Sequence, residues 1–141
     1  MTLPSAPRVH PVLFVHRVQG LAPGVYAFPR SEQGQTLLRA RLRQEFSWSA
    51  VATAPDHLPL FQLIAARTER TASRLSCHQE IAGASAFSLG MLAEFDSHLQ
   101  DAPWRYRELF WEAGVLGQVL YLEAEACGLR GTGIGCYFDD A

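Results

Sequence analysis

Cysteine and histidine are the residues of this chain that could act as nucleophiles, bases or metal ligands, and their spacing limits the chemistry open to them. The three cysteines, Cys77, Cys127 and Cys136, include no Cys-x-x-Cys pair. An odd number at this spacing argues against a disulfide framework and against a structural zinc site. Cys77 is followed directly by His78, whereas a nucleophile and its base need separate positions. We therefore predict no catalytic cysteine and no metal site.

Two pairs of acidic residues are close enough in sequence for acid–base or metal chemistry. They are Glu94 with Asp96 and Asp139 with Asp140. Paired carboxylates can serve as general acid and base, or they can bind a divalent cation. Both pairs fall where a strand or the chain ends, and acids at such positions usually face solvent. We interpret both pairs as solvated.

A glycine-rich segment near the end of the chain is the third candidate. Gly131, Gly133 and Gly135 flank a short run with β-like composition, Thr132 to Phe138. Glycine inside a strand commonly marks a place where a ligand or another backbone approaches closely. The segment is predicted to be a central strand that follows a tight turn.

A long helix between Trp104 and Cys127 must position this segment. At about 100° per residue, one broad arc of the helix carries apolar or small residues and no charge. Its members are Leu109, Phe110, Ala113, Leu116, Gly117, Leu120, Tyr121, Ala124 and Cys127. We expect Asp101 to cap the start of the helix and Gly128 to supply the left-handed residue after its end. The sequence therefore predicts a helix with a buried face.

A second face of this helix is also too apolar for ordinary exposure to solvent. Its acids are accompanied by Val115, Val119 and Leu122, and burial of such a face contributes roughly 25 cal/mol per Å². We therefore predict a dimer through these residues. Gly114 and Gly117 each cost about 1 kcal/mol relative to alanine inside a helix, which indicates a flat groove that another helix or a planar ligand could approach.

The remaining segments predict an α+β layered domain. Strand-like runs occur at Val12–Val18 and Val25–Phe28, and Ala86–Phe95 is apolar on both sides, as in an interior strand. An amphipathic helix is expected over Thr68–Ile81. Leu37–Phe46 could be a strand or a short helix, and its pattern leaves both open.

Length and composition are typical of one globular domain. The chain has 141 residues, 48% of them hydrophobic, and a formal net charge of −2. This balance gives no general attraction for nucleic acid or for an anionic membrane. No run approaches about 18 consecutive apolar residues, and the first residues lack the apolar core of a signal peptide. We expect a cytoplasmic protein that binds neither nucleic acid nor membrane.

Three segments together resemble the nitroreductase-fold flavoproteins. They are GLAPGVYAF at Gly20–Phe28, CHQEIAGASAFSLGMLAEF at Cys77–Phe95 and YRELFWEAGVLGQVLYLEAEACGLRGTGIGCYFDD at Tyr106–Asp140. The similarity is greatest to the SagB-type dehydrogenases, also called thiazoline/oxazoline oxidases, and particularly to their tandem form. The resemblance implies a nitroreductase-like α+β sandwich with a central, mostly antiparallel sheet and a long buried dimerisation helix. It also implies non-covalent FMN between the halves of a homodimer or of a tandem pair of domains.

The same resemblance implies which residues contact FMN. Gly133, Ile134, Gly135 and Cys136 match the segment whose backbone approaches the flavin ring. Ser5 matches part of a Pro-Ser stretch that lines the ring from the amino-terminal side. No dedicated catalytic residue is implied, because the flavin itself carries the hydride chemistry.

We therefore expect an FMN-dependent oxidoreductase that acts on a small molecule or peptide, with peptide azolines, quinones and nitro compounds as candidate substrates. A basic phosphate-binding segment and a carboxy-terminal arm, both usual in the family, are not found in the sequence. Residues 1–141 are accordingly interpreted as a single truncated domain or one half of a tandem enzyme. The alternative is a degenerate, non-catalytic scaffold or partner subunit that has lost FMN. Glu112 belongs to the family's helix pattern, and it could be either a functional residue or a hydrogen-bonding residue at the interface.

Overall fold

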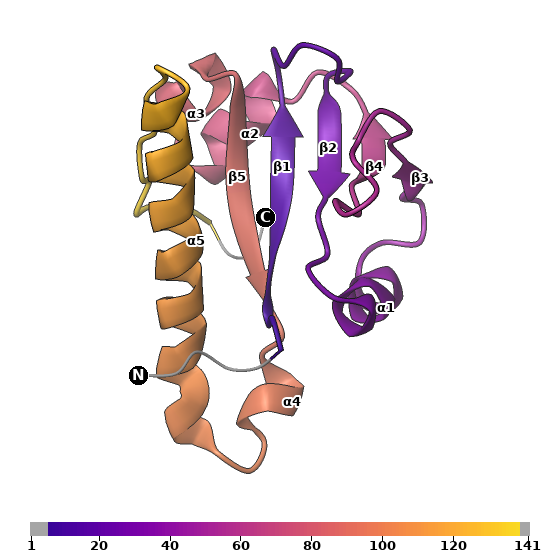
Figure 1. Cartoon of the computed structure of the whole chain (residues 1–141), viewed down its shortest axis with the longest axis vertical. Coiled ribbons are helices and arrows are strands. Elements are labelled where there is room, and N and C mark those ends of the chain that lie inside the picture. The colour runs from indigo at the N-terminus through magenta and orange to yellow at the C-terminus, as the bar shows by residue number, and fades with distance from the viewer. Residues whose placement is uncertain (1–5, 139–141) are drawn as a thin grey trace.

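A five-stranded antiparallel sheet forms the centre of the computed structural model, which describes residues 6–138 (Figure 1). The strands are β1 (Val9–Val15), β2 (Gly24–Ala27), β3 (Ser49–Ala50), β4 (Phe61–Ala65) and β5 (Phe87–Ala93). Their order in the sheet is β3-β4-β2-β1-β5, and every neighbouring pair is antiparallel. β1 pairs with β5 over its whole length, from Val9 opposite Ala93 to Val15 opposite Phe87.

Helices flank this sheet on several sides. They are α1 (Glu32–Arg41), α2 (Glu69–Leu75), α3 (Glu80–Ala84), α4 (Asp96–Leu99), a 3-10 turn η1 (Pro103–Arg105) and α5 (Tyr106–Ala126). In Figure 1, α5 stands beside β5 along most of the height of the molecule, and α2 and α3 lie behind the strands. α1 lies below β3, towards the opposite edge of the sheet from α5. The predicted α+β class with an antiparallel sheet is confirmed.

The apolar core is small and is centred on the sheet. Its strand residues are Val9, Val15, Tyr26, Ala27 and Leu63, and its helix residues are Leu38, Ala72, Ala82 and Leu109. α1, α2, α3 and α5 thus contribute one buried hydrophobic side chain each. Because α5 adds only Leu109 to this core, the helix depends on other contacts for its position.

The carboxyl end of α5 has the geometry expected from its sequence. Gly128 adopts φ +70°, its N–H donates to the carbonyl of Glu125 at 3.0 Å, and the N–H of Leu129 donates to Ala124 at 2.8 Å. These two hydrogen bonds form a Schellman motif, which favours glycine at the left-handed position. The role predicted for Gly128 is confirmed. The role predicted for Asp101 is wrong, because α5 follows directly on η1, with Arg105 as its N-cap residue and no side-chain capping bond.

Two predicted strands are confirmed as β1 and β2, although β1 begins three residues earlier than expected, at Val9. The ambiguous segment 37–46 belongs mainly to α1, which starts at Glu32 because the side chain of Ser31 accepts a hydrogen bond from the N–H of Gly34 at 3.0 Å. β4 was not predicted, since its five residues show no clear alternation.

Two further expectations are corrected by the structure. β5 is the edge strand of the sheet rather than an interior one, and its Phe87 and Leu92 remain exposed. The helix expected over 68–81 is divided into α2 and α3. Cys77 and His78 interrupt it with φ values of 52° and 62°, and residues in this left-handed region cannot continue a right-handed helix.

Candidate functional site

The predicted cofactor segment follows α5 but is not a strand. Gly133, Ile134, Gly135 and Cys136 lie in irregular backbone, so the expectation of a central strand is wrong. The N–H of Gly133 donates to the hydroxyl of Tyr121 on α5. Farther along, the N–H of Phe138 donates to the carbonyl of Leu75 at 2.9 Å, which directs the segment towards α2 instead of the sheet. Ser5 lies outside the described residues.

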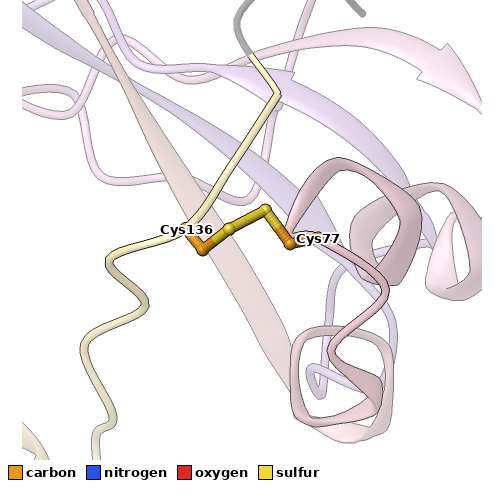
Figure 2. The surroundings of a disulfide bond; sticks show 2 residues. All are labelled: Cys77 and Cys136. Atoms are coloured by element: carbon orange, nitrogen blue, oxygen red, sulfur yellow. A yellow bond between two sulfur atoms is a disulfide. The ribbon is translucent and has the colours of Figure 1, made fainter.

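A disulfide joins Cys136 to Cys77, in the turn between α2 and α3 (Figure 2). Their Cα atoms are 5.8 Å apart, within the usual range for such a bond. The prediction that the cysteines form no disulfide is therefore wrong. A separation of 59 residues leaves no local spacing signal, and the odd total reflects Cys127, which is free and exposed.

The two glycines of this segment differ in the space around them, which is open at Gly135 and occupied by Tyr121 at Gly133. A Cβ built at Gly135 would meet no atom within 4 Å, and Gly135 does not have a positive φ. A Cβ at Gly133 would lie 3.1 Å from the hydroxyl of Tyr121. The N–H groups of Ile134 and Gly135 donate no hydrogen bond within the described residues. Glycine at such an open position permits the close approach of a ligand to the backbone.

Tyr121 is a site residue that sequence reasoning did not single out. It connects the cofactor segment with α5, because its ring also lies 3.4 Å from the Cβ position of Gly131. The sequence signal that could have identified Tyr121 is its position, as a tyrosine, within an arc of small and apolar residues. On the wheel this tyrosine shares a side of α5 with Phe110, Gly114 and Gly117. Outside the helix's own backbone, no described atom lies within 4 Å of a Cβ added at either of these two glycines, so the surface of α5 is open at both positions.

Most of α5 is exposed, contrary to the prediction of a broad buried face. Its buried residues are Leu109 and Glu112 alone among the described positions of the helix. The exposed fractions of Val115, Val119 and Leu122 are 42%, 49% and 59%. The predicted burial of α5 is not observed because no helix or strand in the described part of the chain covers its apolar arcs.

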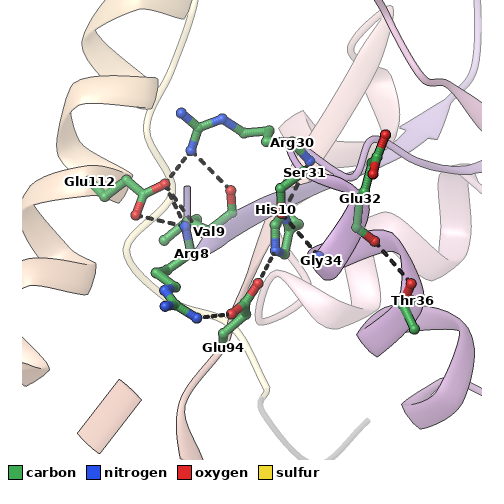
Figure 3. Close-up of polar contacts among 10 residues, drawn as sticks. All are labelled: Arg8, Val9, His10, Arg30, Ser31, Glu32, Gly34, Thr36, Glu94 and Glu112. Carbon is green, nitrogen blue, oxygen red and sulfur yellow. Dashed lines mark hydrogen bonds and ion pairs between the residues drawn. The ribbon is translucent and has the colours of Figure 1, made fainter. Parts of the chain in front are cut away.

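Glu112 anchors α5 to the sheet through a buried polar network (Figure 3). Its carboxylate accepts hydrogen bonds from the N–H of Arg8, at 3.1 Å to each oxygen, and from the N–H of Val9 at 3.2 Å. The guanidinium of Arg30 also donates to it. Glu112 is only 6% exposed. Of the two interpretations left open by the sequence, the structure favours a hydrogen-bonding residue, which acts within the chain.

Glu94 forms the second half of this network. It accepts from Arg8 Nη1 at 2.5 Å and pairs with His10 Nε2 at 3.0 Å, while His10 Nδ1 accepts the N–H of Arg30 at 3.1 Å. The bond at Nδ1 places the imidazole proton on Nε2, so that His10 donates to Glu94. Burial acts to raise the pKa of Glu94, but the hydrogen bonds from His10 and Arg8 together hold that pKa below its ordinary value. The interpretation of Glu94 as a solvated acid is wrong, since it is buried.

An open groove of about 740 Å³ lies beside α2 and α3. Arg70 and Arg74, one helical turn apart, line it together with His78 and Glu80. Both arginines are exposed. Within residues 6–138, no cluster of three or more histidine, cysteine or acidic residues could hold a metal ion. None of the helices in the described part of the chain is long and apolar enough to cross a bilayer.

Comparison with known proteins supports the fold. No protein-family model matches the chain, and no curated protein matches it. Among solved structures, it is similar to the crystal structure of a protein from Anabaena variabilis ATCC 29413 that is described as a candidate nitroreductase, with a TM-score of 0.67 and 26% sequence identity. The match covers 94% of this chain and 22% of that chain. The fold is therefore nitroreductase-like, and the chain spans less than a quarter of the protein that it matches.

Proposed function

We propose that this chain is part of an FMN-dependent oxidoreductase of the SagB-type dehydrogenase group. The observation that carries the proposal is the likeness, over 94% of the chain, to the Anabaena protein described as a candidate nitroreductase. Proteins with this fold usually bind flavin. Peptide azolines, quinones and nitro compounds are the candidate substrates, and the cytoplasm is the proposed location.

The segment Gly133–Cys136 would hold the flavin ring. Gly135 offers unobstructed backbone, and the N–H groups of Ile134 and Gly135, which have no acceptor among the described residues, can donate to acceptor atoms on the ring edge. Tyr121 holds the segment against α5 through its hydroxyl group. FMN, when bound, would supply hydride transfer, and the chain would supply position and hydrogen bonding.

We also propose that α5 binds a second copy of this chain or the matching domain of a tandem protein. Val115, Val119 and Leu122 form an exposed apolar stripe, and the centre of a stable interface is typically apolar. Gly114 and Gly117 lie on the other arc of α5, beside Tyr121, and are not part of this stripe.

The charges of α5 favour an antiparallel pair. Arg105 and Arg107 lie at its amino end, whereas Glu123 and Glu125 lie at its carboxyl end. Two copies that cross near Val115 in opposite directions would bring the basic end of each helix to the acidic end of the other. Such complementarity favours this orientation over a parallel one.

One observation favours the alternative, a scaffold that has lost FMN. The phosphate of FMN needs charge-assisted partners, but Arg130, the basic residue nearest to the cofactor segment in sequence, pairs with Glu125. The absorbance spectrum of the purified protein, before and after addition of FMN, separates the two functions. Flavin bands that remain with the protein after gel filtration would support the oxidoreductase, and a colourless protein that retains no added FMN would support the scaffold.

A further inference from the structure

The Cys77–Cys136 disulfide is placed where a reductant can reach it. Cys77 is half-buried, and Cys136 is exposed. The bond connects the turn between α2 and α3 to the segment after α5 (Figure 2). Thiol–disulfide exchange requires that an attacking thiolate approach one of the two sulfurs, and access is one determinant of its rate.

Few other contacts hold the segment from 129 to 138 in place. It contains no helix or strand, and every residue in it except Ile134 is exposed. At the end next to α5, the segment is held by the bond from Leu129 to Ala124 and by the ion pair of Arg130 with Glu125. Farther along, it is held by the bond from Gly133 to Tyr121, the bond from Phe138 to Leu75, and a ring contact between Phe138 and His78 at 6.0 Å. The two contacts of Phe138 lie two residues from Cys136, so they hold the same end of the segment as the disulfide.

At the other end of the disulfide, Cys77 lies in a turn whose backbone conformation is uncommon for residues other than glycine. Cys77 and His78 are consecutive non-glycine residues with positive φ, a conformation that L-residues adopt only when their surroundings impose it. The disulfide and the Phe138 contacts are available to impose it. Cleavage of the bond would consequently loosen both the segment and the turn.

We propose that the Cys77–Cys136 disulfide is a redox-sensitive latch that holds residues 129–138 against the α2–α3 turn, and that a dithiol reductant opens it. One thiolate of the dithiol attacks a sulfur of the disulfide, breaks the S–S bond, releases one cysteine as a thiolate and forms a mixed disulfide with the other. The second thiol of the reductant then attacks the mixed disulfide and releases the second cysteine. Two electrons and two protons pass to Cys77 and Cys136, and the reductant leaves as its own disulfide. In a reducing compartment such a bond is transient, as expected of a switch.

The latch also bears on the proposed cofactor site, and this consequence rests on the proposed FMN function. The closed latch fixes the backbone of Gly133–Cys136, and a preorganised site binds its ligand more tightly than a mobile one. We expect the oxidised protein to bind FMN more tightly than the reduced protein.

Hydrogen exchange followed by mass spectrometry tests the latch on the full chain, with and without dithiothreitol. The hydrogen-bonded amides of Gly133 and Phe138 should exchange at least about tenfold faster after reduction. Cys77→Ser should exchange fast in both conditions, and Cys127→Ser, which changes the free thiol, should behave as wild type. Cys136→Ser repeats the test from the other side of the bond if Cys77→Ser does not fold.

Equal exchange in oxidised and reduced wild type would overturn the proposal, as would three alkylatable thiols in the non-reduced protein. FMN titration of the same two samples provides an independent result. Failure of both samples to bind FMN would contradict the proposed function while leaving the latch supported by the exchange data. Tighter binding by the reduced sample would contradict the stated direction of control.

Discussion

Replacement of Glu112 by alanine should detach α5 from the sheet. The carboxylate of Glu112 accepts hydrogen bonds from the backbone N–H groups of Arg8 and Val9 and from the guanidinium of Arg30. Alanine leaves these donors without their acceptor in a place where Glu112 itself is 6% exposed. Since Leu109 is the other buried residue of α5, little else would hold the helix.

The expected loss of stability is large. Removal of one partner from a buried ion pair costs about 3–5 kcal/mol, and each buried donor without an acceptor costs about 1–3 kcal/mol. These terms describe the same groups in part, so we expect a total of about 4 kcal/mol. Domains of this size have a free energy of unfolding of about 5–15 kcal/mol, and Glu112→Ala should therefore lose between about a quarter and four fifths of it.

Urea unfolding followed by circular dichroism measures this loss. Glu112→Gln, which keeps one carbonyl acceptor but not the charge, should lie between wild type and alanine. The matched control is Glu123→Ala, at an exposed position farther along the same helix, which should change stability by no more than about 0.5 kcal/mol. Equal effects of Glu112→Ala and Glu123→Ala would refute the anchoring role.

Three further predictions follow from particular contacts. Gly34→Ala should cost about 3 kcal/mol, because its Cβ would overlap Cε1 and Nε2 of the buried ring of His10. Gly90→Ala, whose Cβ meets no atom within 4 Å, is the control in the same thermal melts. Val119→Glu should convert dimers to monomers or aggregates, as measured by sedimentation velocity. A wild-type protein that sediments as a monomer at micromolar concentration would contradict the proposed dimer. The folded-state pKa of Glu94 is below its ordinary value of 4.5, so its stabilising effect is complete above that pH and is lost as the pH falls through the folded pKa. Urea unfolding at several values between about pH 3 and 6 should show this loss in wild type and a flatter profile in Glu94→Gln.

The sequence predicted the elements that have strong local signals. The helical repeat of apolar residues over the 21 residues of α5 predicted this helix. Gly128 predicted its end, because a single glycine at this position satisfies the Schellman geometry. β1 and β2 were predicted from β-branched and aromatic composition. The fold class followed from these elements together with the resemblance.

The remaining features depend on contacts between distant residues, for which one sequence carries no spacing signal. Glu112 and Arg8 are 104 positions apart, and Cys77 and Cys136 are 59 apart. The segment after α5 had the composition of a strand, but its disulfide and the bond from Phe138 to Leu75 hold it elsewhere. Tertiary contacts here override local propensity, as they often do for short β-like runs.

FMN titration of wild type and Gly135→Val, paired with thermal melts of both proteins, tests the central claim most directly. Gly135 is exposed, has no positive φ and leaves open space around its Cβ position, so valine should change stability by no more than about 0.5 kcal/mol. If the flavin ring lies against this backbone, wild type should quench FMN fluorescence on binding and Gly135→Val should not, while the two melts coincide. A wild-type protein that binds no FMN in this titration would contradict the proposed FMN-dependent oxidoreductase and would favour the scaffold that has lost FMN.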